Sequence, residues 1–151
     1  REGDMRVMNS LLAVVALAVF VAIVAGGIAR AQAVAVPPDP LAGSEWRPVE
    51  IRAEAIDDET SVYVRFAADG KVSGSSGCNR FFGTYKIAGT ELAFSALATT
   101  RKACPEPLMK LEGRFLTALQ ETRSFERDRT RLVLRNGAGG TMMRLAQTDW
   151  D

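Results

Sequence analysis

The sequence contains no histidine in its 151 residues. This absence removes the commonest general base, the usual pH switch and the commonest protein ligand for metal ions. The chain has 2 cysteines without C-x-x-C spacing, which is a poor basis for a zinc site or a redox-active pair. We therefore expect no enzymatic activity, no bound metal and no cofactor.

The chain also lacks an excess of charge of either sign, with 19 Lys and Arg, 18 Asp and Glu and a net charge of +1. Residues 1–33 hold three arginines, one glutamate and one aspartate, so the remainder carries 16 basic and 16 acidic side chains. A neutral domain does not offer the basic surface that phosphate neutralisation requires. We expect no nucleic-acid partner.

One long apolar run is present, from Leu11 to Ile28, and Ala31-Gln32-Ala33 follows it. Met5 is a more natural start than Arg1, so residues 1–4 are interpreted as an upstream extension. This pattern predicts a signal peptide over residues 1–33. The alternative is a retained membrane anchor, because the run is close to the shortest that spans a bilayer. Both interpretations predict export to the periplasm or beyond, with residues 11–28 anchoring an uncleaved chain in the inner membrane.

The rest divides into a proline-rich linker at 34–40, a domain at 41–147 and a tail at 148–151. Alternating apolar and polar residues, broken by turn signals such as Asp69-Gly70, predict strands separated by short links. The predicted strands are Trp46–Ala53, Ser61–Phe66, Lys71–Ser75, Phe81–Ile87, Glu91–Phe94, Ala98–Arg101, Ser124–Arg127, Arg131–Arg135 and Thr141–Leu145.

A helix is predicted between Pro105 and Arg123, because apolar residues recur there at helical spacing. Leu111, Phe115 and Leu119 belong to its apolar stripe, and Glu112 is assigned to the solvent-facing side. Many strands, one helix and hairpin-length links predict an α+β fold: a curved antiparallel sheet wrapped on a single helix.

Cys78 and Cys104 are predicted to form a structural disulfide, because the exported compartment is oxidising and the cysteine count is even. A redox-active or metal-binding pair and two free buried thiols remain as alternatives. Asn79 is interpreted as a turn residue that tolerates a left-handed backbone. Phe81, Phe82 and Tyr85 are assigned to core and cross-strand packing.

The segment Gly77–Tyr85 resembles the G-C-N-x-F-x-G-x-Y signature of the META/HslJ-like family. The resemblance implies a cracked-barrel-like sheet around one helix, a bacterial envelope location linked to heat shock or antibiotic tolerance, and a binding or structural role without established enzymatic activity. The residues that match the family motif are Trp46, Gly77, Asn79, Phe81, Gly83, Tyr85, Thr100, Glu112, Phe115 and Leu119.

Two functional hypotheses follow. The first is a monomeric, non-catalytic envelope domain that binds another protein or supports envelope integrity under stress. An exposed patch for that partner would contain Tyr63, Arg65, Arg80, Arg101 and Lys102, although a solvated face explains the same residues. The second hypothesis is a carrier or sensor of an apolar, lipid-like ligand in a slot between helix and sheet. Its lining would come from Val62, Val64, Phe81, Leu92, Leu111, Phe115 and Leu134.

Overall fold

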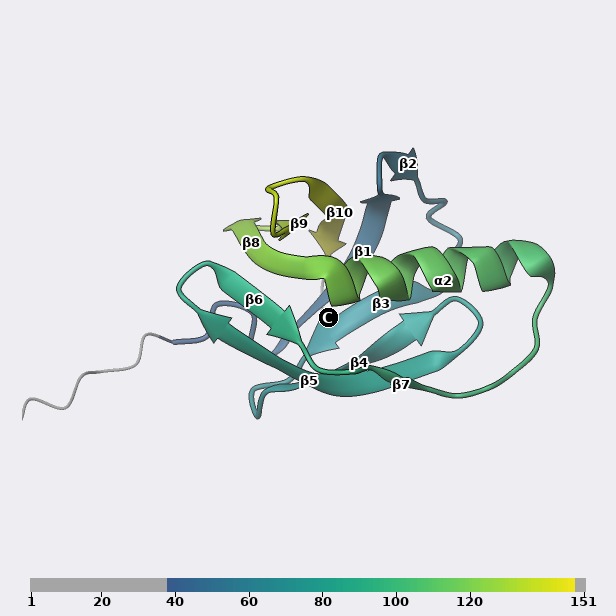
Figure 1. The fold of residues 1–151 in the computed structure, drawn as a ribbon, viewed down its shortest axis with the longest axis horizontal. Helices are drawn as coiled ribbons and strands as arrows, with labels where there is room; N and C mark the ends of the chain where they lie inside the picture. Colours follow the sequence, from purple (N-terminus) through teal and green to yellow (C-terminus); the bar gives the residue numbers. More distant parts are fainter. Residues whose placement is uncertain (1–37, 149–151) are drawn as a thin grey trace, which may run out of the picture. The chain divides into compact units, whose positions relative to one another are not determined.

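Antiparallel strands dominate the computed structural model, which describes residues 38–148 (Figure 1). The predicted leader, most of the linker and the last three residues of the tail lie outside the described residues. The elements are β1 (Ser44–Ile51), β2 (Glu54–Ala55), β3 (Val62–Phe66), β4 (Lys71–Ser76), β5 (Arg80–Ala88), β6 (Glu91–Phe94), β7 (Ala98–Thr99), α2 (Glu106–Glu121), β8 (Thr122–Asp128), β9 (Arg131–Asn136) and β10 (Thr141–Gln147).

The strands form a closed antiparallel barrel. Its order is β1-β3-β4-β5-β6-β8-β9-β10, and β10 pairs again with β1, so that Trp46 lies opposite Gln147 and Ile51 opposite Met143. The predicted α+β architecture, a curved and cracked-barrel-like sheet wrapped on a single helix, is therefore wrong: the fold is a mostly-β closed barrel with one helix. The prediction failed because local periodicity indicates which residues form strands. It does not indicate that β1 and β10, far apart in the sequence, pair with each other.

The helix α2 lies across one side of the barrel and packs against β1, β4, β6, β9 and β10 (Figure 1). It starts after Pro105, with Pro107 in its first turn, where the missing N–H breaks no helical hydrogen bond. The predicted apolar stripe is confirmed, since Leu111, Phe115 and Leu119 are buried. No helix within residues 38–148 has the length and apolar character that crossing a membrane requires.

The barrel interior is filled by side chains from the strands and from α2. Trp46, Phe66, Phe81 and Phe115 are fully buried. The rings of Phe81 on β5 and Phe115 on α2 meet edge to face with centroids 5.5 Å apart, a favourable aromatic geometry. The helix therefore contributes to the same core as the strands rather than forming a separate layer.

The β6–β8 contact is the weakest join in the barrel. These two strands pair at a single position, Glu91 with Ser124. The main-chain N–H of Phe125 also donates to the carbonyl of Thr90 at 3.0 Å. Every other adjacent pair of strands around the ring has at least three paired positions. We call this contact the seam; it lies where the chain has just left the helix to enter β8.

Candidate functional site: a buried polar cluster and an exposed basic face

The predicted disulfide is confirmed: Cys78 and Cys104 are bonded, with their Cα atoms 6.0 Å apart. Cys78 follows Gly77, whose φ of +102° is a conformation that glycine adopts without steric cost. Cys104 immediately precedes Pro105, where α2 begins. The bond therefore ties the turn between β4 and β5 to the start of the helix.

A buried carboxylate, Glu112 on α2, makes a second link between the same two segments. Only 8% of Glu112 is exposed, so its assignment to the solvent-facing side of the helix is wrong. Its Oε2 accepts from the main-chain N–H of Asn79 at 2.9 Å, and its Oε1 accepts from Asn79 Nδ2 at 3.1 Å. The Ser76 hydroxyl bridges Glu112 Oε2 at 2.6 Å and the Asn79 carbonyl at 2.7 Å. These bonds compensate the carboxylate for the water that it has lost.

The Asn79 side chain uses its full hydrogen-bonding capacity inside the protein. Its Oδ1 accepts from Thr100 Oγ1 at 2.8 Å and from the Lys102 N–H at 2.7 Å. Its Nδ2 donates to the Lys102 carbonyl at 3.2 Å as well as to Glu112. Asn79 is not among the residues with positive φ, so the prediction of a left-handed turn residue is wrong and Gly77 fills that role. Asn79 instead joins three segments, which leaves no amide group for a ligand.

The remaining motif residues lie in the barrel framework. A Cβ on Gly83 would meet Leu97 Cδ2 at 2.8 Å and Ser95 Oγ at 2.9 Å, so a larger residue there would require these two side chains between β6 and β7 to shift. The Tyr85 hydroxyl donates to Asp39 Oδ2 at 2.5 Å. Burial, and secondarily this hydrogen bond, raise the pKa of Tyr85 well above its usual value. Trp46 Nε1 donates to Ser44 Oγ at 2.7 Å.

Three residues of the predicted patch, Tyr63, Arg65 and Arg80, lie on one outer surface of the barrel, and Arg101 and Lys102 lie in the segment that follows β7. Tyr63 on β3 lies across from Ser75 on β4, which lies across from Arg80 on β5. In the next row, Arg65 lies across from Ser73, and Ser73 across from Phe82. Arg101 and Lys102 follow Thr100, whose main-chain N–H donates to the Arg80 carbonyl at 3.0 Å. We call Tyr63, Arg65, Arg80, Phe82, Arg101 and Lys102 the basic face.

Phe82 belongs to this face because it is 52% exposed, which makes its assignment to the core wrong. The alternation of β5 carried the missed signal: Phe81 and Tyr85 point inward, so Phe82 between them must point outward. Arg65 is paired with Glu45 at 2.7 Å. The exposed side chains of Arg80, Arg101 and Lys102 form no ion pair within residues 38–148.

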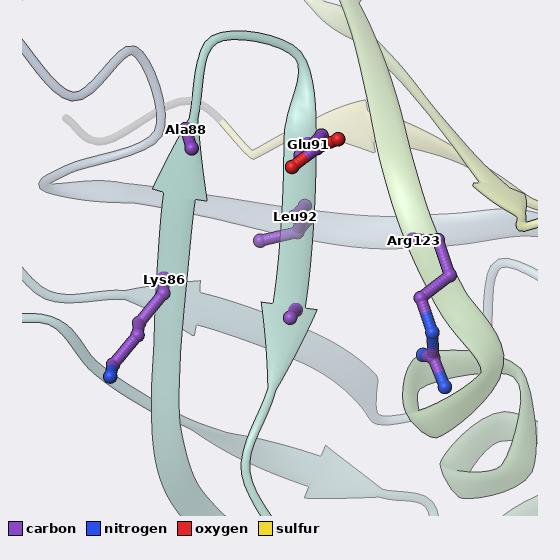
Figure 2. A pocket seen from close by; sticks show the side chains of 6 residues that line it. Lys86, Ala88, Glu91, Leu92 and Arg123 are labelled. Carbon is purple, nitrogen blue, oxygen red and sulfur yellow. The ribbon is translucent and has the colours of Figure 1, made fainter.

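The described residues also form surface cavities, among them two that are lined by strand residues. One of about 310 Å³ borders the seam and is lined by Lys86, Ala88, Glu91, Leu92, Ala93 and Arg123 (Figure 2). The other, of about 330 Å³, is lined by Val49, Arg131, Leu132, Val133, Arg144, Leu145 and Ala146. Sequence analysis identified neither, because each combines small or ordinary side chains from strands that are separated along the chain.

Within residues 38–148, no three Cys, Asp or Glu side chains form a group that could hold a metal ion.

Comparison with known proteins gives a consistent result. An NMR structure of a protein from Burkholderia xenovorans is 24% identical, with a TM-score of 0.58, and the match covers 80% of this chain and 97% of that one. A second NMR structure is 26% identical, with a TM-score of 0.59 and coverage of 74% and 94%.

A crystal structure of a DUF4847 family protein from Bacteroides vulgatus is 19% identical, with a TM-score of 0.57 and coverage of 74% and 97%. No curated protein matches the chain. The META domain family matches residues 39–149, which include every motif residue named above. The chain therefore belongs to the META domain family.

Proposed function

We propose that this META domain is a non-catalytic module of the bacterial envelope that binds another protein through the basic face. The observation that carries the proposal is Phe82: a large apolar residue, 52% exposed, held on β5 next to Arg80, Arg101 and Lys102, which form no ion pair within residues 38–148. Exposed aromatic and arginine side chains are the groups that contribute most to protein–protein interfaces. The partner surface is accordingly acidic, with an apolar group that covers the Phe82 ring.

The polar groups of the motif support a non-catalytic role. Asn79, Ser76 and Glu112 are buried and hydrogen-bonded to one another, so they are not exposed to a substrate. Arg80, Arg101 and Lys102 are exposed instead and are free to meet a partner. Binding rather than chemistry is the task that these two groups of residues support.

The disulfide supports an extracytoplasmic location, because such bonds persist in oxidising compartments. We place the domain on the outer side of the inner membrane and assign its partner to the same compartment. A contribution to envelope integrity under stress follows from that location, with the rigid barrel serving as a scaffold for the partner.

The alternative of an apolar-ligand carrier finds less support. The seven residues that would line its slot are each no more than 7% exposed and belong to one continuous core. Phe81 and Phe115, from opposite sides of the expected slot, pack directly against each other. A lipid-like ligand would have to displace these contacts, which makes the filled core a better candidate for stability than for transport.

Site-specific cross-linking of the full chain in its own cells tests the proposal. A photo-reactive amino acid replaces Phe82, and matched exposed apolar positions, Val49 on β1 and Met109 on α2, serve as controls. We expect one discrete protein adduct at position 82 that is absent at positions 49 and 109. Arg80→Glu should abolish the adduct, while Arg131→Glu on β9 should leave it. Equal cross-linking at all three positions, or insensitivity to Arg80→Glu, would overturn the proposal.

A further inference from the structure

The cavity at the seam lies on the same outer surface of β5 as Phe82. Along β5, Arg80, Phe82, Thr84, Lys86 and Ala88 are the exposed, outward-facing residues. Arg80 and Lys86 are six residues apart, which corresponds to roughly 20 Å along a strand. The two ends of β5 therefore present one outer row, with the basic face at the start and the cavity at the end.

The cavity is hollow because the side chains at its centre are small. Ala93 on β6 lies directly across from Lys86, and Ala88 lies across from Glu91. On the other side of β6, pairing with β8 ends after Glu91, so no further strand residue fills the space beside Leu92. The result is a depression of about 310 Å³ with an apolar floor, a size that accommodates one or two amino-acid side chains.

Two cations stand on opposite sides of β6 at this cavity: Lys86 on β5 and Arg123 on β8 (Figure 2). Lys86 is exposed and has no ion pair within the part of the chain that the structure describes. Arg123 Nη1 donates to the carbonyls of Gln120 and Thr122, both at 2.7 Å, which fixes the guanidinium at the end of α2. Its Nε and Nη2 have no partner among residues 38–148. Glu91 is the single anion in the lining.

We propose that this cavity is a second subsite for the same partner, and that it receives a carboxylate-bearing residue from an extended acidic segment lying along β5. This inference rests on the proposed function and narrows the partner to a peptide-like chain of about seven residues. A fixed guanidinium and a flexible ammonium are suited to carboxylate recognition, and the alanine floor accepts the apolar stem of the bound residue.

An extended peptide fits this surface better than a lipid bilayer does. A membrane-binding surface needs apolar side chains that protrude together beyond the charged ones. Here a single protruding ring, Phe82, stands between cations, and the far end of the row is concave rather than convex. Between Phe82 and Lys86, the outward-facing residue of β5 is Thr84, a small polar side chain.

The test measures binding of the full chain to a fluorescein-labelled seven-residue peptide of alternating glutamate and leucine. The same peptide with glutamine in place of glutamate, and phosphatidylglycerol vesicles, are the comparison probes. We expect Lys86→Ala and Arg123→Gln each to raise the Kd about 2–5-fold, in line with the strength of exposed ion pairs. Lys110→Ala, an exposed cation on α2, is the control and should leave the Kd unchanged.

A third variant tests the shape of the cavity independently of the charges that surround it. Ala93→Leu fills the floor without changing any charge, and we expect it to weaken binding at least as much as either charge variant. Far-UV circular dichroism and thermal melting confirm that each variant is folded, and a variant that fails to fold is replaced by Ala93→Val or Lys86→Gln. Arg80→Ser and Phe82→Ser report on the proposed function itself.

The outcomes are distinguishable. Loss of binding in Arg80→Ser and Phe82→Ser, with none in Lys86→Ala, Arg123→Gln or Ala93→Leu, overturns the subsite and leaves the proposed function standing. No loss in any variant, or equal binding of the glutamine peptide, overturns both. Vesicle binding in the absence of peptide binding identifies an anionic membrane as the ligand and also overturns the proposal.

Discussion

Replacing Glu112 with glutamine tests whether the buried polar cluster holds the motif together. The carboxylate accepts hydrogen bonds at both oxygens, from the Asn79 N–H and Ser76 hydroxyl at one and from Asn79 Nδ2 at the other. An amide accepts at only one of its two ends. Whichever way the glutamine is oriented, its NH₂ group faces a buried donor, and at least one hydrogen bond is lost.

The expected cost follows from the burial of that lost bond. Leaving a buried donor unpaired costs about 1–3 kcal/mol, with bonds to charged groups at the upper end. The matched control is Glu121→Gln on the same helix, where the carboxylate pairs with Arg52 at 2.6 Å and both side chains are over 40% exposed. An exposed pair of this kind contributes about 0–1 kcal/mol. The same chemical change should therefore differ in effect between the two positions.

Urea unfolding at pH 7 with the disulfide intact measures the difference. We expect Glu112→Gln to lower the midpoint by roughly 1 M, given the typical dependence of stability on urea for a domain of this size. Glu121→Gln should shift it by a small fraction of that. The cluster has no structural role if Glu112→Gln unfolds at the same urea concentration as Glu121→Gln.

Three further predictions concern stability. Removing the disulfide with Cys78→Ser and Cys104→Ser together should cost about 3.5 kcal/mol by loop entropy for a separation of 26 residues; an unchanged urea midpoint would contradict this. The raised pKa of Tyr85 in the folded protein contributes to the free energy of unfolding. This contribution is fully present below pH 10, the usual tyrosine pKa, and is lost as the pH rises from there through the higher folded-state pKa. The free energy of unfolding should therefore fall less steeply with rising alkaline pH in Tyr85→Phe than in the unmodified protein. Equal slopes for the two proteins would refute the raised pKa of Tyr85. Ala53→Gly should increase the free energy of unfolding by about 1 kcal/mol and so raise the urea midpoint, because Ala53 has a φ of +65°, which glycine adopts more easily. The control is Ala55→Gly in β2, which should not raise the midpoint.

Much of the secondary structure was predictable from local patterns. The alternation in Val62–Phe66 and the helical stripe from Leu111 to Leu119 both report burial on one face, and the structure confirms both. The disulfide was also predictable, because an even cysteine count in a domain that the sequence predicts to be exported limits the alternatives. The strained turn at Arg52 and Ala53 was not, since neither residue type favours a positive φ.

The basic face was predictable only in part. Tyr63, Arg65, Arg80, Arg101 and Lys102 were identified as a possible exposed patch, but Phe82 was assigned with Phe81 and Tyr85 to core and cross-strand packing. The alternation of inward- and outward-facing residues in β5 indicates that Phe82 faces outward. The seam cavity could not be predicted, because Lys86 and Arg123 are distant along the chain and meet only when β6 and β8 come together.

The sequence by itself determined the longer strands, the helix, the disulfide and membership in the family, because each depends on residues that are close together or on a short ordered motif. Only the tertiary structure decided that the sheet closes, that Glu112 is buried and that Phe82 is exposed beside Arg80 on the outer surface of β5. Closure joins Trp46 to Gln147 across the whole domain, and the burial of Glu112 depends on donors from β4 and β5. Contacts between distant segments have no local signal, so the surface available for binding emerges only when the barrel is complete.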